Sequence, residues 1–332
     1  MYEKRGWWIL KIGVVGATGM VGSYFIKILE ERDFKADEIY FFASARSAGK
    51  TVTYKGVKHT IIALDDGIYG MGLDMAMMAA GGDISARYAP GLADAGVTVI
   101  DNSSHFRMDE DVPLVVPEVN IEAARAHKGI IANPNCSTIQ SVVALAPLHK
   151  AYGLKRVIYT TYQAVSGAGI DGWNDLENGQ AGKPHAYFAH PIANNLIPQI
   201  DTFKENAYTG EEMKMINETK KILNAPDLAI TATCVRVPIF NVHSVCINAE
   251  FENKFVLKEL VRILQDAKGV AITDDPANLV YPMPRDADGK DDVFVGRIRR
   301  DESVENGVNL WVVSDNLRKG AALNAVQIAE LI

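Results

Sequence analysis

A short apolar stretch followed by closely spaced glycines constrains the fold of this chain more than any other feature. Residues 9–15 form a nearly continuous apolar run, which is typical of a buried parallel strand. The run stops at the glycine-rich segment 16–22, and an amphipathic helix is expected directly after it. A strand, a glycine turn and a helix in this order favour a dinucleotide-binding α/β fold, whereas the glycines alone are also compatible with a simple tight turn. The residues expected to contact the dinucleotide here are Gly16, Thr18, Gly19, Met20, Val21 and Gly22.

The loop after the second predicted strand, 38–43, lacks the acidic residue that usually binds the ribose hydroxyl of NAD. It offers Ser44, Arg46 and Ser47 instead, and two hydroxyls with a guanidinium suit a 2′-phosphate. We therefore predict NADP rather than NAD, with a solvated loop arginine as the alternative interpretation of Arg46.

Further strands at 73–80 and 97–100, with a helix at 84–92 between them, continue the alternation of strand and helix. This alternation predicts a doubly wound parallel sheet that binds ligands beyond the carboxyl ends of its strands. Arg107 follows such a strand end, so it is a candidate binding residue, although an exposed loop arginine fits equally well.

Cys136 lies in the segment 133–138, Asn-Pro-Asn-Cys-Ser-Thr, just after a rigid turn and at the expected start of a helix. The unpaired N–H groups and the dipole of a first helical turn favour negative charge and lower the pKa of a thiol. We therefore consider Cys136 a covalent nucleophile, with a small buried apolar residue as the alternative.

The second half of the chain combines predicted strands with isolated polar residues. A helix is expected over 139–148 and strands over 157–164, 229–237 and 241–251, whereas 173–188 shows no clear periodicity. Gln163, Arg236 and His243 interrupt these strands, and His243 shares the parity of an apolar face. The ordinary explanation for Gln163 is an exposed polar residue, and that for His243 is a hydrogen-bonded histidine in the core. Cys234 and Cys246 are expected to pack in the core.

A capped amphipathic helix is expected from Thr209 to about Leu223. Glu211 and Lys214 lie three residues apart on one face of it, a spacing that is usually surface decoration worth about 0.2–0.5 kcal/mol. A last strand at 311–316 and an alanine-rich helix at 320–332, which is expected to pack back on the first domain, close the chain.

Composition excludes several classes of protein. The chain has 332 residues, enough for two domains with proper cores, and only three cysteines, at spacings that match neither a disulfide framework nor a zinc site. We expect a reducing, cytoplasmic location and no bound metal. The formal charge of −7 and the dispersed basic residues argue against nucleic-acid binding. No run of eighteen apolar residues suggests membrane insertion, and the stretch at Trp7 and Trp8 is too short for a signal sequence.

Four separated motifs resemble those of the aspartate-semialdehyde dehydrogenase family and occur in the family's order, so the resemblance runs from about Lys11 to the end. They are the glycine turn 16–22, the cysteine segment 133–138, Arg236-Val237-Pro238 with His243-Ser244, and the segment 316–320. The residues at Trp7 and Trp8, before the first strand, are unlike the short start that the family leads us to expect.

The resemblance implies a Rossmann-type NADP-binding domain over 1–133, completed by the C-terminal helix 316–332, and a second α/β domain over 134–315 for catalysis and dimerisation. It implies the reversible reduction of L-aspartyl 4-phosphate by NADPH to L-aspartate 4-semialdehyde, through a cysteine thioester. This reaction belongs to the biosynthesis of lysine, threonine, methionine and diaminopimelate. The expected partners are the small-molecule substrate, phosphate and a second copy of the chain.

The resemblance also implies a role for each candidate residue. Cys136 would be the nucleophile, His243 the acid–base residue and Gln163 the residue that orients the intermediate. Arg236 would bind the α-carboxylate and Glu211 the ammonium group of the substrate. The remaining expected contacts are Asn135, Arg107 and Lys214 with phosphate, Ser166 and Gly167 with the nicotinamide half of the cofactor, and Asn316 with the cofactor.

Two other functions fit part of this pattern. An N-acetylglutamyl-phosphate reductase would share the fold and the thiol chemistry, but its substrate carries no ammonium group for Glu211 to bind. A cofactor-binding redox sensor would oxidise Cys136 without ever acylating it.

Overall fold

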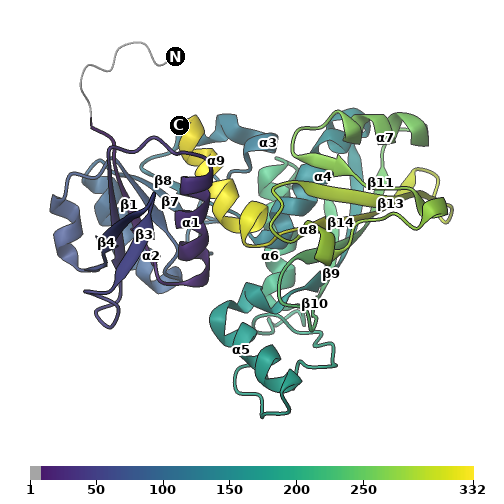
Figure 1. Cartoon of the computed structure of the whole chain (residues 1–332). Helices are drawn as coiled ribbons and strands as arrows, with labels where there is room; N and C mark the ends of the chain where they lie inside the picture. The colour runs from purple at the N-terminus through teal and green to yellow at the C-terminus, as the bar shows by residue number, and fades with distance from the viewer. Residues whose placement is uncertain (1–8) are drawn as a thin grey trace. The chain divides into compact units, whose positions relative to one another are not determined.

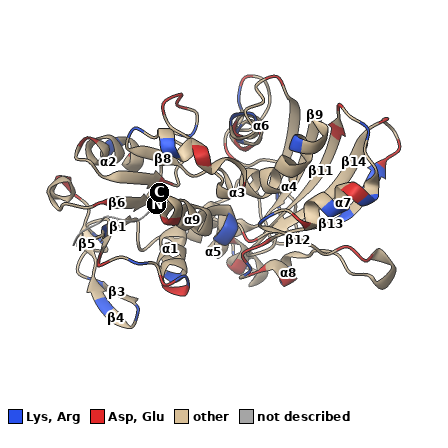
Figure 2. Cartoon of the chain, turned by 90° about the horizontal axis from the view of Figure 1, so that it is seen from above, with Lys and Arg blue, Asp and Glu red and all other residues tan. Residues whose placement is uncertain are grey.

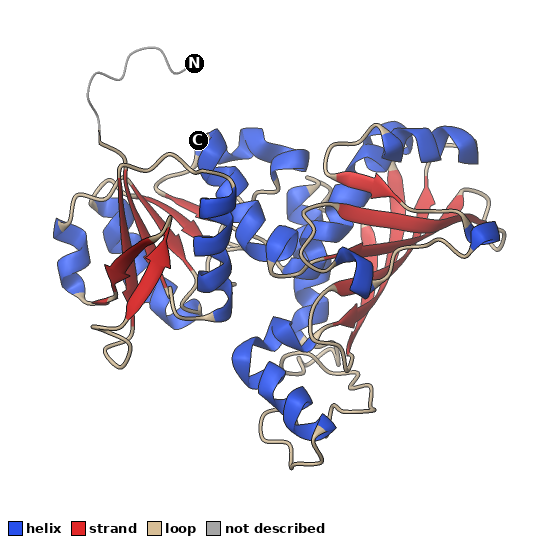
Figure 3. Ribbon diagram, in the orientation of Figure 1, coloured by secondary structure: helices blue, strands red, loops and turns tan. Residues whose placement is uncertain are grey.

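The computed structural model describes residues 9–332 (Figure 1), so Trp7 and Trp8 lie outside the described part of the chain. The chain divides into two compact units, which are described here one at a time. Unit 1 comprises the residues up to Pro113 together with Glu122–Asn133 and Ala325–Ile332. Unit 2 comprises Leu114–Ile121 and Pro134–Asn324. Both units are built from helices packed on a sheet (Figure 3), which confirms the predicted α/β class.

The main sheet of unit 1 is parallel throughout and has the order β5-β2-β1-β6-β7-β8. Counted along the chain within this sheet, that order is 3-2-1-4-5-6, the order of a dinucleotide-binding fold. The four predicted strands are confirmed, some with shorter bounds. The strands are β1 (Lys11–Val15), β2 (Glu38–Ala43), β5 (Ile62–Ala63), β6 (Met75–Met78), β7 (Thr98–Asp101) and β8 (Ile130–Ala132).

Helix α1 (Met20–Glu31) follows the glycine turn as predicted, and α2 (Gly82–Asp94) occupies the second predicted helical stretch. Phe25, Ile28 and Leu29 form the buried face of α1 and are fully shielded from solvent. The hairpin of β3 (Thr51–Tyr54) and β4 (Val57–Thr60) forms a separate small sheet that the periodicity did not indicate.

The glycine turn between β1 and α1 is held by close backbone packing. The N–H groups of Gly16 and Ala17 donate to Phe42 O over 2.8 and 3.0 Å. Gly16 has a φ of +86°, and a Cβ there would lie 2.6 Å from Ala79 O. At Gly22 a Cβ would overlap Gly16 O. The turn therefore requires glycine at both positions, and it leads into α1, whose N-cap residue Gly19 provides no side-chain cap.

Unit 2 is built on a mixed six-stranded sheet with the order β10-β9-β11-β14-β13-β12. The outer pairs β10–β9 and β12–β13 are parallel, and the inner pairs are antiparallel. The strands are β9 (Leu154–Gln163), β10 (Ala229–Arg236), β11 (His243–Phe251), β12 (Val270–Ile272), β13 (Val293–Asp301) and β14 (Gly307–Ser314).

Helices α4 (Cys136–Tyr152), α6 (Gly210–Ile222) and α7 (Leu257–Gln265) pack together against one face of this sheet. The predicted helix at Thr209 is confirmed, including its capping box between Thr209 and Glu212. The sequence analysis did not identify β12, β13 and α7. The short elements of unit 2 are α3 (Pro117–Asn120) and α8 (Pro284–Ala287), and α5 (Gly169–Gln180) lies beyond the ends of β9 and β10 (Figure 1). The last helix, α9 (Leu323–Leu331), begins in unit 2 and continues in unit 1.

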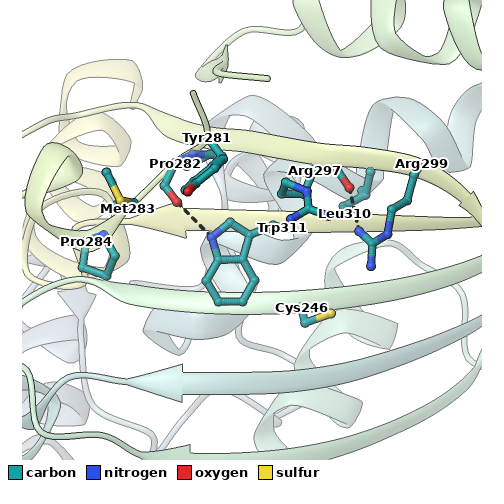
Figure 4. Close-up of a pocket in the computed structure, with 9 residues that line it drawn as sticks. All are labelled: Cys246, Tyr281, Pro282, Met283, Pro284, Arg297, Arg299, Leu310 and Trp311. Atoms are coloured by element: carbon teal, nitrogen blue, oxygen red, sulfur yellow. Dashed lines mark hydrogen bonds between the residues drawn. The ribbon is translucent and has the colours of Figure 1, made fainter. Parts of the chain in front are cut away.

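The opposite face of the unit 2 sheet carries large, partly exposed side chains. Tyr162 and Trp311 pack on each other with ring centroids 5.5 Å apart. Cys246 is half-buried on this face and lines a pocket of about 300 Å³ together with Trp311 and Arg299 (Figure 4). Cys234 is fully buried as predicted, but the prediction that Cys246 packs in the core is wrong, because its parity in β11 is opposite to that of the buried residues.

Acidic and basic residues are interspersed along the backbone of each unit (Figure 2). Among residues 9–332, no helix has the length and apolar character needed to cross a membrane. Within the same range, no group of three or more His, Cys, Asp or Glu residues is arranged to hold a metal ion.

The packing of the glycine turn leads to a first prediction. Gly22→Ala should lower the free energy of unfolding by about 1–3 kcal/mol, because the added methyl group forces the backbone at Gly16 to move. Gly70→Ala is the matched control in the same unit, since nothing lies within 4 Å of a Cβ at that position. Urea denaturation of both variants measures the difference, and equal stabilities would contradict the proposed role of this contact.

Candidate active site

The start of α4 is organised by the side chain of Asn135. Its Oδ1 accepts hydrogen bonds from the N–H groups of Ser137 at 3.0 Å and Thr138 at 3.2 Å, so Asn135 is the N-cap of the helix. Cys136 is the first residue of α4, and it is half-buried and not part of a disulfide. The prediction that the cysteine begins a helix is therefore confirmed.

Two carboxylates from α6 hold Asn135 from the other side. Glu211 Oε1 accepts from Asn135 Nδ2 at 2.8 Å, and Glu218 Oε2 accepts from the Asn135 backbone N–H at 2.6 Å. Both glutamates are buried. They are seven residues apart, which places them on one face of α6, two turns from each other. Sequence reasoning missed Glu218, although its spacing from Glu211 is a signal that could have identified it.

Gly320 forms the other wall beside the cysteine. A Cβ at this position would lie 3.1 Å from Cys136 Cβ and 3.4 Å from Cys136 Cα. The segment before α9 therefore lies so close to the cysteine that any side chain at position 320 would be in tight contact with Cys136. The sequence contained this glycine within a noted motif, but periodicity gave no indication that it contacts Cys136.

Gln163 and Arg236 lie side by side at the ends of β9 and β10, where they are in register. Both are almost completely buried, at 1% and 5% exposure. The exposed position considered for Gln163 is therefore wrong. Arg236 Nη1 donates to Ala164 O over 2.6 Å, whereas its Nε is buried with no hydrogen-bond partner among the described residues. Burial lowers the pKa of Arg236, while the nearby Glu211 carboxylate and Cys136 oppose this shift.

His243 is the first residue of β11 and is fully buried. Its Nδ1 accepts a hydrogen bond from the Ala164 N–H at 3.0 Å, so the neutral ring carries its proton on Nε2. Nε2 has no hydrogen-bond partner within residues 9–332. The pKa of His243 lies well below 6.5, mainly because the ring is buried and secondly because of the positive charge of Arg236. A backbone hydrogen bond with Val242 has a smaller, opposing effect.

Gly167 brings the histidine and the arginine together. A Cβ at Gly167 would lie 2.9 Å from Arg236 Nη1 and 3.1 Å from His243 Nε2. Its neighbour Ser166 is buried and accepts a hydrogen bond from Asn316 Nδ2 at 3.0 Å, and Asn316 Oδ1 accepts from the Val242 N–H at 2.8 Å. Asn316 thus joins the turn at Ser166 to the residue that precedes His243.

Lys214 lies between two carboxylates. Its Nζ is 2.9 Å from Asp201 Oδ2 and 3.3 Å from Glu211 Oε2. Because the Glu211 side chain is only 6% exposed, this pair is not the surface decoration that its spacing suggested. Asp201 was not identified from the sequence. It has a φ of +71°, and Gly210 packs directly against its carboxylate, so this loop is fitted closely to α6.

Unit 2 by itself therefore contains ten of the candidate residues, which come from the start of α4, from α6, from β9 and the turn after it, from the end of β10, from the start of β11 and from the segment before α9. They are Asn135, Cys136, Gln163, Ser166, Gly167, Glu211, Lys214, Arg236, His243 and Asn316. The remaining candidates, namely Arg107, the glycine turn and the loop at Arg46, belong to unit 1.

Arg107 is buried in unit 1 and is anchored by backbone carbonyl groups. Its Nε donates to Asn133 O and its Nη2 to Asn102 O, both over 2.9 Å. The exposed loop position considered for Arg107 is therefore wrong. Ser44 and Arg46 are exposed and Ser47 is half-buried, in a turn closed by the hydrogen bond from Ser47 N to Ser44 O at 2.8 Å. Among the described residues, Arg46 has no ion-pair partner, so its guanidinium is accessible at the end of β2.

Comparisons with known proteins match most of the chain. Residues 11–127 match the family model of the semialdehyde dehydrogenase NAD binding domain, and residues 145–319 match that of the semialdehyde dehydrogenase dimerisation domain. The aspartate-semialdehyde dehydrogenase of Aquifex aeolicus is 51% identical over 331 residues, which cover 97% of each chain. The chain belongs to the aspartate-semialdehyde dehydrogenase family. It is therefore an enzyme of the oxidoreductase class.

Two solved structures of aspartate-semialdehyde dehydrogenases are also similar. Aspartate semialdehyde dehydrogenase II of Vibrio cholerae, complexed with ASA, has a TM-score of 0.93 at 46% identity and 98% coverage of both chains. The Candida albicans aspartate-semialdehyde dehydrogenase, with NADP, has a TM-score of 0.75 at 27% identity and the same coverage. Family membership excludes the two alternatives considered from the sequence, an N-acetylglutamyl-phosphate reductase and a redox sensor.

The burial of His243 predicts a pH dependence of stability. Because its pKa in the folded chain lies below the unfolded value near 6.5, the unfolded state binds more protons as the pH falls below that value. The neutral, buried His243 therefore makes its full contribution to the free energy of unfolding above about pH 6.5. This contribution is lost at lower pH, by up to about 1.4 kcal/mol per pH unit. His243→Asn should therefore show a shallower loss of unfolding free energy between about pH 7 and 5 than the wild type. Identical slopes in urea denaturation would contradict this assignment.

Proposed function

We propose that this enzyme catalyses the reversible, NADPH-dependent reductive dephosphorylation of L-aspartyl 4-phosphate to L-aspartate 4-semialdehyde. The observation that carries this proposal is the position of Cys136 at the capped start of α4, in the same unit as a buried imidazole, guanidinium and carboxylate. The product would serve the biosynthesis of lysine, threonine, methionine and diaminopimelate. Family membership supports the choice of this substrate.

In the proposed reaction the Cys136 thiolate attacks the acyl carbon of the substrate. The C–S bond forms as the bond from carbon to the phosphate oxygen breaks, and inorganic phosphate leaves. The dipole of α4 and the Cys136 N–H favour negative charge on the sulfur, while Asn135 occupies the next two N–H groups. Asn135 thus fixes the turn that carries the Cys136 side chain.

His243 acts through Nε2, because Nδ1 is occupied by the Ala164 N–H. A neutral ring with its proton on Nε2 donates a hydrogen bond to the oxygen that becomes negative when the acyl carbon turns tetrahedral. This assignment refines the acid–base role suggested by the family resemblance. Nε2 could take up a proton only if the ring proton moved to Nδ1, and Nδ1 could then no longer accept the hydrogen bond from the Ala164 N–H. Gln163, buried next to Arg236, would orient the same intermediate.

Opposite charges on the substrate require opposite charges in the pocket. Arg236 is proposed to bind the α-carboxylate through its guanidinium, whose Nε has no hydrogen-bond partner among the described residues. Glu211 is proposed to bind the α-ammonium, and the position of Lys214 at this carboxylate supports the role because it shows that Glu211 accommodates an ammonium group. Asn135, Lys214 and Arg107 are proposed to bind the phosphate group.

The residues of unit 1 fit a bound NADP. Glycines 16 and 22 let the turn pack closely on neighbouring backbone, and the turn leads into a helix whose first N–H groups have no side-chain cap, an arrangement that suits a pyrophosphate. The turn 16–22 would hold the pyrophosphate, Ser44, Arg46 and Ser47 the 2′-phosphate, and Ser166 and Gly167 the nicotinamide half, while Asn316 would contact the cofactor from the segment before α9. When bound, NADPH supplies the hydride that converts the thioester to the aldehyde and releases the cysteine. We propose residues 1–133 with 316–332 as the cofactor domain and 134–315 as the catalytic domain.

We also propose that the enzyme is a homodimer, as the match to a dimerisation domain implies. The sheet face that carries Tyr162, Trp311 and the pocket at Cys246 (Figure 4) is the surface that supports this proposal. It offers aromatic rings and arginines, which are enriched in protein interfaces.

One assay tests the function. NADPH formation from aspartate semialdehyde should require both NADP and phosphate, and Cys136→Ala should abolish it while cofactor binding is retained. Cys246→Ser is the matched control and should keep wild-type turnover, because this thiol lies on the opposite face of the sheet. Appreciable turnover by the Cys136 variant, or turnover without phosphate, would contradict the proposed thioester mechanism.

Arg46 tests the choice of cofactor. Arg46→Asp should raise the KM for NADP by roughly 10- to 100-fold, the loss expected for about one charge-assisted hydrogen bond of 1.5–3 kcal/mol. It should leave the KM for NAD unchanged or lower. Lys50→Asp, which makes the same charge change at another exposed position of the loop, should have a small effect on both. Equal effects of Arg46→Asp on the two cofactors would argue against a 2′-phosphate contact.

A further inference from the structure

A long loop follows α5 and returns to the arginine of the site. From Ala181 to Thr209 the chain contains no helix or strand, only isolated bridges. Loops of this length inside a compact domain are usually functional or disordered. Its first part shows no periodicity in the sequence, and α5 and this loop lie beyond the ends of β9 and β10 (Figure 1).

The loop is anchored by a buried carboxylate from α5. Asp175 is 3% exposed and accepts hydrogen bonds from the N–H groups of Ala186 at 2.5 Å, Phe188 at 2.9 Å and Tyr187 at 3.1 Å. Burial acts to raise the pKa of Asp175, but these three hydrogen bonds outweigh it, so the pKa lies below its usual range. The carboxylate therefore stays charged and fixes three consecutive residues of the loop.

The anchored segment reaches Arg236 through Phe188. The centre of the Phe188 ring is 6.0 Å from the guanidinium carbon of Arg236, within the range of a cation–π contact. The same ring packs on a buried apolar cluster that includes Val165 and Ile192. Phe188 thus contacts both a buried core and the arginine.

A later part of the loop binds the backbone of the same arginine. Ile197 N donates to Arg236 O at 3.0 Å, and Arg236 N donates to Ile197 O at 2.9 Å. Tyr187, Phe188 and Asp201 line a pocket of about 210 Å³ with Arg236 as one of its walls. The loop therefore constrains both the backbone and the guanidinium of Arg236, and it encloses the space beside that charge.

We propose that Asp175 is a positioning residue, and that the segment 186–188 which it anchors is the wall that selects a free α-carboxylate on the substrate. Through Phe188 the wall fixes the guanidinium of Arg236 and limits the space beside it to a short α-amino acid. This inference rests on the proposed function of Arg236 and deepens it. Asp175 itself contacts only the loop backbone and acts through Arg236.

The test compares two aldehydes that differ only in the group that Arg236 binds. Aspartate semialdehyde carries the α-carboxylate, and 3-aminopropanal lacks it. Asp175→Asn should raise the KM for aspartate semialdehyde by roughly 10- to 100-fold, as expected when a binding group is displaced by about 1 Å. It should have little effect on kcat, on the KM for NADP or on the weak turnover of 3-aminopropanal. The ratio of kcat/KM for the two aldehydes should fall accordingly.

Two further variants make the outcome decisive. Glu177 lies on the same helix as Asp175 but is exposed, so Glu177→Gln should keep the wild-type ratio of kcat/KM for the two aldehydes. Phe188→Ala leaves the Asp175 anchor in place and should lower the ratio, which provides a test even if Asp175→Asn does not fold. The inference would be overturned if the ratio stayed unchanged in both Asp175→Asn and Phe188→Ala. It would also be overturned if kcat/KM fell equally for the two aldehydes. If the wild type fails to oxidise aspartate semialdehyde, the proposed function fails instead.

Discussion

The hydrogen bonds of Asn135 are the interaction on which the site of unit 2 depends. Its side-chain oxygen caps α4, while its side-chain amide and backbone N–H bind two carboxylates of α6. Because one residue connects both helices, the direction of the Cys136 side chain is fixed by the packing of α4 against α6. The same contacts keep Glu211 beside the cysteine.

The site also shows how a chain maintains several buried polar groups within a small volume. Arg236 and His243 approach each other around Gly167, an arrangement that the absence of a side chain at that residue makes possible. A buried neutral imidazole beside a guanidinium avoids the repulsion between two positive charges, which is consistent with the lowered pKa of His243. On the α6 side, the Lys214 ammonium offsets the carboxylates of Glu211 and Asp201.

The sequence was sufficient where local chemistry determines the structure. The strand and glycine turn at 9–22, the start of a helix at Cys136 and the capping box at Thr209 could all be predicted, because neighbouring residues specify them. Gly320 and Asp201 could not, because their roles depend on contacts between segments that are distant in sequence. For Glu218 the spacing from Glu211 indicated a shared helix face, but its partner Asn135 is distant in sequence. Cys246 was predicted wrongly although the strand carries a signal: Cys246 shares its parity with Asn248 and Glu250, on the face of the unit 2 sheet that is partly exposed.

The division of α9 between the two units has a consequence for biosynthesis of the chain itself. Unit 1 begins near the N-terminus, yet it includes Ala325–Ile332, and Arg32 of α1 forms an ion pair of 2.6 Å with Glu330. During translation, the first unit therefore cannot be completed until residues 325–332 have emerged from the ribosome. Domains generally fold as units during synthesis. In this chain, a nascent first domain must wait, with the surface for its final helix uncovered, while the whole of unit 2 is made.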